Sequence, residues 1–449
     1  MVSVAALNDF LWGPGTLALF LGTGLFLTLR TRFLPWRNLG WALRSALGRE
    51  ARQNRHSGDI SPFSSLMTLL AATIGTGNIV GVATALAAGG PGALVWMELS
   101  ALLGLSTMFS ECLLAVKFRR VNARGQFSGG PMYVLRDGLG WRRLGSLFAL
   151  LAVTASFGIG CMTQSNSIAE ALRVSFDAPA LPCGIVIALL AFAVFLGGVG
   201  RISSVSAVVV PATAVLYLAA GIAVILGNLE ALPTALSVML HDAFSPRAAA
   251  GGFAGSAMAH AARWGIARGV FSNEAGLGSA AISAAAASTD HPARQGYISM
   301  TGVFFDTMVV CTVTGLAICC SGALDSGADG AALTILAFQS GLGKAGGIFV
   351  SLSVTLFAFA TILGWEYQGE KAFEFLFGTR YLLVYRALFA AAAAWGAVQQ
   401  VDAVFRLSDI CNALMCLPNL LCLLALSGLV AREARSFQAA IHPKPLKKL

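Results

Sequence analysis

The chain has 449 residues, of which 57% are hydrophobic and only 11% are charged. Soluble domains carry about 25% charged residues, so a chain this poor in charge could not cover its surface with polar groups in water. The net charge of +9 could suggest nucleic-acid binding, but the basic residues lie between apolar runs and form no basic domain. Composition therefore excludes a soluble protein and favours the lipid bilayer, not nucleic acid, as the partner.

Apolar stretches near 20 residues, the length that crosses roughly 30 Å of hydrocarbon, predict eleven transmembrane helices. In chain order they lie at 10–30, 65–88, 92–117, 144–171, 181–199, 205–227, 257–289, 297–321, 346–368, 381–398 and 409–430. Long or polar connections lie at 31–62, 118–142, 228–256 and 322–345, and the last is expected to hold a short helix over the outer mouth. We treat 1–449 as one transmembrane domain, in which an extra helix (10–30) precedes two five-helix sets (65–227 and 257–430) and a cytoplasmic tail (431–449).

Orientation follows from the distribution of Lys and Arg. One side of the predicted bundle carries 24 of these residues, including Lys444, Lys447 and Lys448 in the tail, and the other side carries six, which together make the 30 present. Basic residues concentrate in cytoplasmic loops. We therefore expect a multi-pass protein of the plasma membrane (the inner membrane in bacteria), with its N-terminus outside and its C-terminus in the cytoplasm.

The nine cysteines and five histidines show no metal-ligand or catalytic spacing. No zinc site, disulfide framework or bound cofactor is therefore expected, and an intramembrane enzyme is disfavoured. A channel is also disfavoured, because no selectivity loop appears. Transport is the remaining class.

Two predicted helices contain sequence that a helix tolerates poorly. The stretch 75–78 (Gly-Thr-Gly-Asn) interrupts one, and 272–276 (Ser-Asn-Glu-Ala-Gly) interrupts the other. Each glycine costs ~1 kcal/mol relative to alanine, and unwound backbone in lipid needs protein, water or ligand as a partner. Broken helices offer N–H groups to a carboxylate and carbonyls to ammonium or sodium, which together suit a zwitterionic amino acid. The alternative is that the glycines only allow close helix crossing.

The two interrupted helices stand five apart in the predicted order. Each therefore opens a set of five helices, and an odd number of helices per set gives the two sets opposite topologies. The pattern predicts an all-α polytopic protein with a 5+5 inverted repeat.

Several motifs carry a family resemblance and span nearly the whole chain. They are GTGNIVGVATALAAGGPGALVWM (75–97), SGGPMYVL (128–135), GIGCMTQSNSIA (158–169), ARGVFSNEAGLGSAAI (267–282), FFDTMVVCTVTGL (304–316), LFAFATILGWEYQGE (356–370) and LPNL (417–420). With these motifs the sequence resembles the alanine/glycine:cation symporter family, also called sodium:alanine symporters. The resemblance implies a leucine-transporter-like fold, sodium as the coupling ion, and a small neutral amino acid such as alanine or glycine as substrate.

The candidate substrate site draws on both breaks and two further helices. Backbone N–H groups of Thr76, Gly77 and Asn78 are expected to hold the carboxylate, although Asn78 could instead cap the second half-helix. Gln164 could reach substrate or form an interhelical hydrogen bond, and the family resemblance favours the substrate. The remaining candidates are Phe271, Ser272, Asn273 and Trp365. Trp365 is expected to limit the substrate to the size of alanine, unless it is an interfacial aromatic.

Sodium favours oxygen ligands, so Gly75, Thr355 and Thr361 are its candidate ligands. Each threonine could instead bond its own helix backbone. Glu274 and Asp306 are expected to support a break or a cation site, because a carboxylate at mid-membrane is costly. A proton-coupled carrier of small neutral amino acids is the alternative, with Glu274, Asp306 or Glu98 holding the proton.

Three further carboxylates stand out. Glu98 and Glu366 occupy positions where the family pattern leads us to expect apolar or aromatic residues. Glu111 is expected to pair with basic residues near the cytoplasmic end of the third helix.

Overall fold

The computed structural model describes residues 4–244, 253–399 and 401–441. These residues are helical almost throughout, and the strands among them form one small hairpin, β1 (Arg120–Val121) with β2 (Phe127–Ser128). The all-α class is therefore confirmed. Arg247 and the tail residues Lys444, Lys447 and Lys448, on which the predicted orientation partly rests, lie outside the described residues.

The N-terminal segment packs along one side of the bundle. It comprises α1 (Val4–Leu11), α2 (Pro14–Arg30), α3 (Leu34–Arg37), α4 (Leu39–Leu47) and η1 (Arg49–Arg52). Pro14 begins α2 at a position where a helix needs no N–H donor. Thr28 of α2 donates to Ser106 Oγ of α7 (Gly92–Lys117) at 2.8 Å, so the extra helix is joined to the bundle by a buried hydrogen bond.

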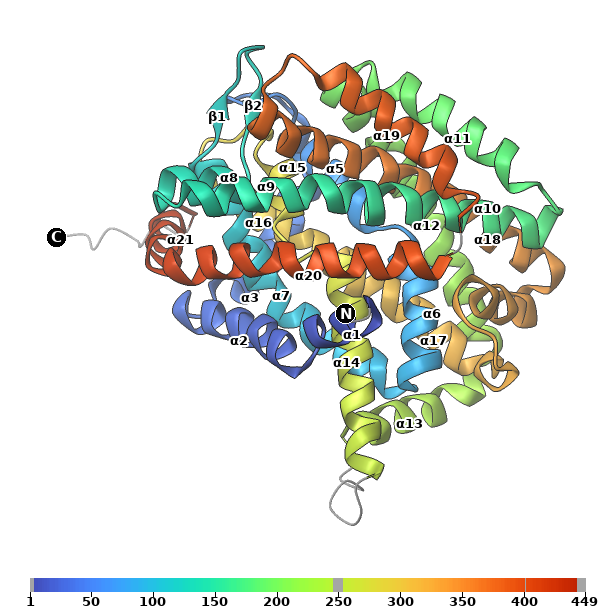
Figure 1. Ribbon diagram of the computed structural model, residues 1–449. Coiled ribbons are helices and arrows are strands. Elements are labelled where there is room, and N and C mark those ends of the chain that lie inside the picture. The colour runs from blue at the N-terminus through green and yellow to red at the C-terminus, as the bar shows by residue number, and fades with distance from the viewer. Residues whose placement is uncertain (1–3, 245–252, 400, 442–449) are drawn as a thin grey trace.

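The first broken helix passes through the interior of the bundle (Figure 1). Ser61 caps the start of α5 (Pro62–Thr73) by accepting from Ser64 N. The chain leaves the helix at Ile74, passes through a π-helical turn, η2 (Gly77–Gly81), and continues as α6 (Val82–Gly89). The two halves are bent by 50°. The interruption expected in this segment is therefore present.

After α7 and the hairpin, the chain forms the remaining helices of its first half. These are α8 (Pro131–Tyr133), η3 (Val134–Gly138), α9 (Arg142–Phe157), η4 (Gly158–Met162), α10 (Thr163–Phe176), α11 (Ala180–Phe195), α12 (Gly198–Gly227), η5 (Leu229–Ala231) and α13 (Leu232–Phe244). α13 lies where the sequence predicted a connection. Its buried Ala235, Met239 and Ala243 recur every four residues, and the indole N–H of Trp96 in α7 donates to the Ala243 carbonyl at 3.1 Å. This apolar face stabilises a helix that is too short to cross the membrane.

The second half begins with the other broken helix. α14 (Phe253–Asn273) and α15 (Ser279–Ala284) are separated by backbone with positive φ at Glu274 (58°), Gly276 (94°) and Gly278 (84°). There follow α16 (Pro292–Val303), η7 (Phe304–Cys311), α17 (Thr312–Cys320), η8 (Ala323–Ser326), α18 (Gly330–Phe377), α19 (Leu382–Gly396), α20 (Val401–Ala425) and α21 (Ser427–Ile441). Gly343, with φ 63°, interrupts α18, so the short helix expected before the ninth span is present as the first part of α18.

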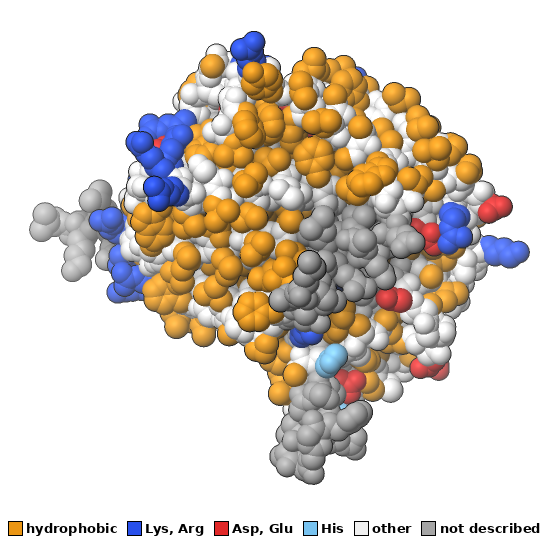
Figure 2. Space-filling model, viewed as in Figure 1, with side chains coloured by type: hydrophobic (Ala, Val, Ile, Leu, Met, Phe, Trp, Pro, Cys, Tyr) orange, Lys and Arg blue, Asp and Glu red, His pale blue; other side chains and the backbone are white. Residues whose placement is uncertain are grey.

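Within the described residues, five helices are long and apolar enough to cross a membrane, or seven if each of two bent pairs counts as one span. Three further apolar helices, α2, α11 and α19, are shorter. Figure 2 shows a broad hydrophobic surface between one edge rich in Lys and Arg and another where Asp and Glu gather. The molecule is thus a multi-pass helical membrane protein.

Candidate functional site

The two broken helices meet at the centre of the molecule. A Cβ placed on Gly77 of η2 would lie 3.1 Å from Ser272 Cα of α14, closer than nine in ten real Cβ contacts. A methyl group at Gly75 would overlap the hydroxyl of Thr361 in α18. Glycine at these two positions therefore lets the first break approach the second break and α18 closely.

The first break is held by side-chain amides. Asn78 Oδ1 accepts from Gly75 N at 2.9 Å, so Asn78 fills the capping role that the sequence left open. Gln164, the second residue of α10, accepts from Thr76 N at 3.4 Å through Oε1 and donates to the Ile159 carbonyl at 2.9 Å through Nε2. That carbonyl belongs to the π-helical turn η4, which directly precedes α10. Gln164 therefore links two irregular segments.

Asp306 in η7 joins the two breaks to a third helix. Its carboxylate accepts from Asn78 Nδ2 at 2.7 Å, from Ser272 Oγ at 2.9 Å and from Thr307 Oγ1 at 2.7 Å. The Asp306 side chain is fully buried, and it forms no salt bridge with any described residue. The sequence pointed to Asp306 but did not predict that it would contact Asn78 and Ser272.

A small cavity lies beside the two breaks. Its volume is about 10 Å³, and it is lined by Ala72, Thr73, Gly75, Gly77, Ile159, Gln164, Phe271, Glu274, Thr361 and Trp365. Besides Glu274, six predicted site residues therefore line the same cavity. Thr76, Asn78 and Ser272 do not line it, and their polar groups make the contacts with the breaks described above.

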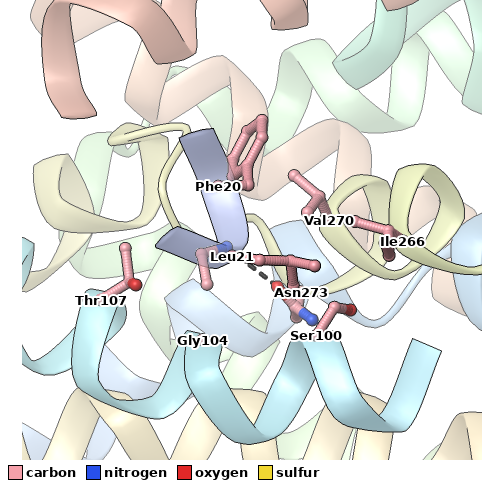
Figure 3. A pocket seen from close by; sticks show the side chains of 9 residues that line it. Phe20, Leu21, Ser100, Gly104, Thr107, Ile266, Val270 and Asn273 are labelled. Carbon is pink, nitrogen blue, oxygen red and sulfur yellow. Dashed lines mark hydrogen bonds between the residues drawn. The ribbon is translucent and has the colours of Figure 1, made fainter. Parts of the chain in front are cut away.

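Asn273 lies on the other side of the second break (Figure 3). It lines a separate pocket with Phe20 and Leu21 of α2, Ser100, Gly104 and Thr107 of α7, and Ile266, Val270 and Ala275. Its oxygen accepts from Ala275 N at 3.0 Å, and its nitrogen donates to Thr307 Oγ1 at 3.0 Å. Asn273 therefore supports the break and does not face the cavity that contains Gln164.

The two threonines expected to bind sodium point in different directions. Six residues at about 100° each turn the helix through roughly 240° relative to the first, so two positions six apart do not share a face. Both threonines donate to a carbonyl of their own helix, Thr355 to Ser351 at 2.8 Å and Thr361 to Phe357 at 3.1 Å, but only Thr361 lines the cavity. Of the two, only Thr361 is positioned beside the break.

The second break is held by carboxylates. Glu274 Oε2 accepts from Ser279 Oγ at 2.6 Å, across the unwound backbone. Glu111 of α7 accepts from Gly276 N at 3.2 Å and from Asn419 Nδ2 of α20 at 2.9 Å. The expectation that Glu111 pairs with basic residues was therefore wrong. Its partners are instead a backbone N–H group of the break and the Asn419 amide. Asn419 belongs to the LPNL motif, but its contact partner was not predicted.

The model of the sodium:alanine symporter family matches residues 1–448. The chain belongs to this family. The resemblance inferred from the motifs is thereby confirmed, and the breaks, the cavity and Gln164 described above are features of a sodium:alanine symporter family member.

Relatives match over nearly the full chain. The sodium/alanine symporter AgcS of Methanococcus maripaludis is 45% identical, over 97% of this chain and 96% of that protein. The probable sodium/glutamine symporter GlnT of Bacillus subtilis is 38% identical, over 97% and 90%. The amino-acid carrier protein AlsT of Bacillus subtilis is 34% identical, over 96% and 90%.

Solved transporter structures share the fold at low sequence identity. The nucleobase-cation-symport-1 family transporter Mhp1 superposes with a TM-score of 0.50 at 12% identity, over 89% of this chain and 97% of that one. A manganese transporter from Eremococcus coleocola gives a TM-score of 0.51 at 15% identity, over 84% and 77%. These similarities show the fold of this family member and carry no information on its substrate.

Glu98 and Glu366, where apolar or aromatic residues were expected, do not line the cavity. Glu98 of α7 accepts from Thr312 Oγ1 of α17 at 2.8 Å. Glu366 of α18 is buried beside Arg386 of α19, with 3.8 Å between Glu366 Oε1 and Arg386 Nε. An ion pair that the sequence reading missed joins Arg268 of α14 to Asp409 of α20 at 2.7 Å.

Proposed function

We propose that this chain is a sodium-coupled symporter of alanine and glycine that works by alternating access. The observation that carries the proposal is the meeting of two broken helices at a small cavity that the side-chain amide of Gln164 also lines. Family membership supports sodium-coupled amino-acid symport. One relative is named as a sodium/alanine symporter and another as a probable sodium/glutamine symporter. Transport, not catalysis, is the activity that this arrangement serves.

The amino acid would bind across the first break. Backbone N–H groups at Thr76 and Gly77 would hold the carboxylate, and Gln164 would exchange its contact with Thr76 N for one with the substrate. Phe271 and Trp365 would bound the side chain. Trp365 packs against Gly160 so tightly that a methyl group on Gly160 would overlap it, which supports a fixed wall and a small substrate.

Sodium would bind where oxygen atoms converge near the breaks. One candidate position lies between the Gly75 region and Thr361, whose hydroxyl faces the break. A second lies at Asp306, where Ser272 and Thr307 hydroxyls and a buried carboxylate meet. An unpaired buried carboxylate is costly, and a bound cation would offset its charge. We leave Thr355 and Asn273 out of the proposed site.

The finer architecture is also a proposal. We assign eleven spans in one domain, with α5–α12 and α14–α20 as inverted halves and α2 as the additional span. α13 would lie outside the membrane core. The basic edge in Figure 2 supports a cytoplasmic C-terminus, with the plasma membrane as the location.

A cluster of buried polar side chains also supports alternating access. Ser65 Oγ donates to the Ser283 carbonyl at 3.1 Å, and the amides of Gln295 and Gln368 donate to the Ser65 and Ser283 hydroxyls, each at 3.4 Å. Gln295 Oε1 and Gln368 Oε1 are buried and have no hydrogen-bond partner among the described residues. Such groups would gain water if this part of the bundle opens during transport.

Reconstituted uptake of radiolabelled alanine and glycine tests the proposal. Sodium, lithium and proton gradients are imposed one at a time on vesicles that contain the purified protein. A sodium gradient alone should drive saturable uptake. Uptake driven by a proton gradient alone would instead support the proton-coupled alternative, which the family's sodium-symporter description does not favour.

A further inference from the structure

Two carboxylates of α18 face one guanidinium of α19. Glu366 and Glu370 lie one helical turn apart, and Arg386 donates to both oxygens of Glu370, at 2.5 Å to Oε2 and 3.1 Å to Oε1. Arg386 is farther from Glu366, with 3.8 Å between Nε and Oε1. Both carboxyl groups therefore lie within 4 Å of the same Arg386 Nε atom. The cluster therefore holds two acids and one base.

Glu366 is the incompletely paired member of this cluster. It is 1% exposed, and its Oε1 has no hydrogen-bond partner among the described residues. Glu370 and Arg386 satisfy each other. An ionised Glu366 would thus be a buried charge whose counter-ion, 3.8 Å away, is already paired more closely with Glu370, and burying such a charge costs several kcal/mol.

Neighbouring groups do not supply the missing positive charge. On α18, Lys371 forms an ion pair with Glu374, with 3.0 Å between Nζ and Oε2. On α19, the Tyr385 hydroxyl is paired with Ser156 of α9 at 2.9 Å, and Cys161 of η4 donates to the Phe389 carbonyl. Among the described residues that form ion pairs with these two acids, Arg386 is the one positive charge, and two ionised carboxylates would exceed it.

We propose that Glu366 is a proton-binding site, and that it shares its proton with Glu370. With one proton between them, the two carboxyl groups carry a single negative charge, which matches Arg386. Two carboxyl groups that face one guanidinium repel each other when both are ionised, so one proton between them is their stable arrangement. A proton suits the site better than a metal cation, because the Ser156 and Tyr385 hydroxyls are paired with each other and the described residues hold no group of three or more acidic, His or Cys side chains placed to bind a metal.

This inference is independent of the transported substrate. It assigns a role to a residue that departs from the family pattern and lies outside the cavity. The proton would be a structural ligand that lets α18 pack against α9 and α19 with an acid in the contact. Glutamine in place of Glu366 would reproduce the shape and the neutrality of the protonated acid.

Infrared spectroscopy of the purified full chain in lipid tests the proposal. The difference spectrum between the unaltered protein and Glu366→Gln should lose the C=O band of one protonated carboxylic acid per chain, and that band should shift in heavy water. Glu374→Gln is the matched control on the same helix. Glu374 accepts from Lys371, Asn122 and Ser128, so that variant should lose carboxylate bands and no protonated-acid band.

Three results would overturn the inference. The first is a Glu366→Gln difference spectrum that contains only carboxylate bands. The second is a Glu366 signal that changes with sodium concentration at constant pH, since a cation would then occupy the site. The third is failure of Glu366→Gln to fold, because a neutral isostere should be tolerated if the acid is already neutral.

Discussion

Asn78 and Asp306 are separated by 228 residues and joined by a 2.7 Å hydrogen bond from the Asn78 amide to the Asp306 carboxylate. The oxygen of that amide accepts from Gly75 N, so one side chain connects the unwound backbone of the first break to η7. Ser272 brings the second break to the same carboxylate. A change in the charge of Asp306 should therefore alter the hydrogen bonding of both breaks.

Asp306→Asn should weaken sodium coupling. In the unaltered protein, sodium and alanine should each tighten the binding of the other by the same factor, typically about 5–150-fold. The variant keeps the side-chain shape and removes the charge, so the factor should fall toward one. Calorimetric titration of alanine in sodium and in choline measures it.

Two further variants sharpen this test. Asp325→Asn, at an exposed carboxylate of η8, should leave the coupling factor unchanged. Thr361→Val should reduce sodium dependence more than it reduces alanine recognition at saturating sodium. Full coupling in Asp306→Asn would remove this carboxylate from the proposed sodium site.

Gln164→Ala should raise the alanine concentration for half-maximal uptake. A lost hydrogen bond to a charged group is worth about 1.5–3 kcal/mol, which corresponds to roughly 10–150-fold. Asn166→Ala is the matched control on α10, because the Asn166 amide donates to the carbonyls of Gly396 and Gln399 and not to the breaks. The control should lower thermal stability without changing alanine affinity. Equal affinity in both variants would contradict a substrate role for Gln164.

Gly160→Ala should reduce alanine uptake more than glycine uptake. The added methyl group overlaps the Trp365 side chain, and the overpacking, which costs about 1–3 kcal/mol, should push the ring toward the cavity. Trp365→Ala should act in the opposite direction and admit larger neutral amino acids. Competition uptake with glycine, alanine and glutamine measures both effects. Gly200→Ala is the control, because a methyl group there has no neighbour within 4 Å, and this variant should leave the uptake of all three amino acids unchanged.

Cysteine labelling checks the orientation. An impermeant thiol reagent added outside intact cells should fail to label Ser57→Cys and should label Ser326→Cys above the background of the parent chain. Both serines are exposed, and they lie in connections that we assign to opposite sides of the membrane. The reverse pattern would invert the proposed topology.

The sequence predicted the positions of the breaks because glycine and small polar residues are unfavourable in a helix whatever surrounds them. It also predicted Gln164 and Trp365 at the cavity, with help from the family motifs. It did not predict the direction of Asn273, because α14 stays helical through Asn273 and its side chain therefore points about 200° away from that of Phe271, which lines the cavity. Contacts such as Glu111 with Asn419 depend on how distant helices pack, and local patterns do not carry that information.

The contact between Gly160 and Trp365 also bears on how relatives of this protein diverge. Because no side-chain atom fits between the two residues, substitution at one position constrains the other. A relative with a larger residue at the position of Gly160 should carry a smaller one at the position of Trp365. We therefore expect these two positions to covary across the family, so that the pair could be used to sort uncharacterised members by the size of the amino acid they carry.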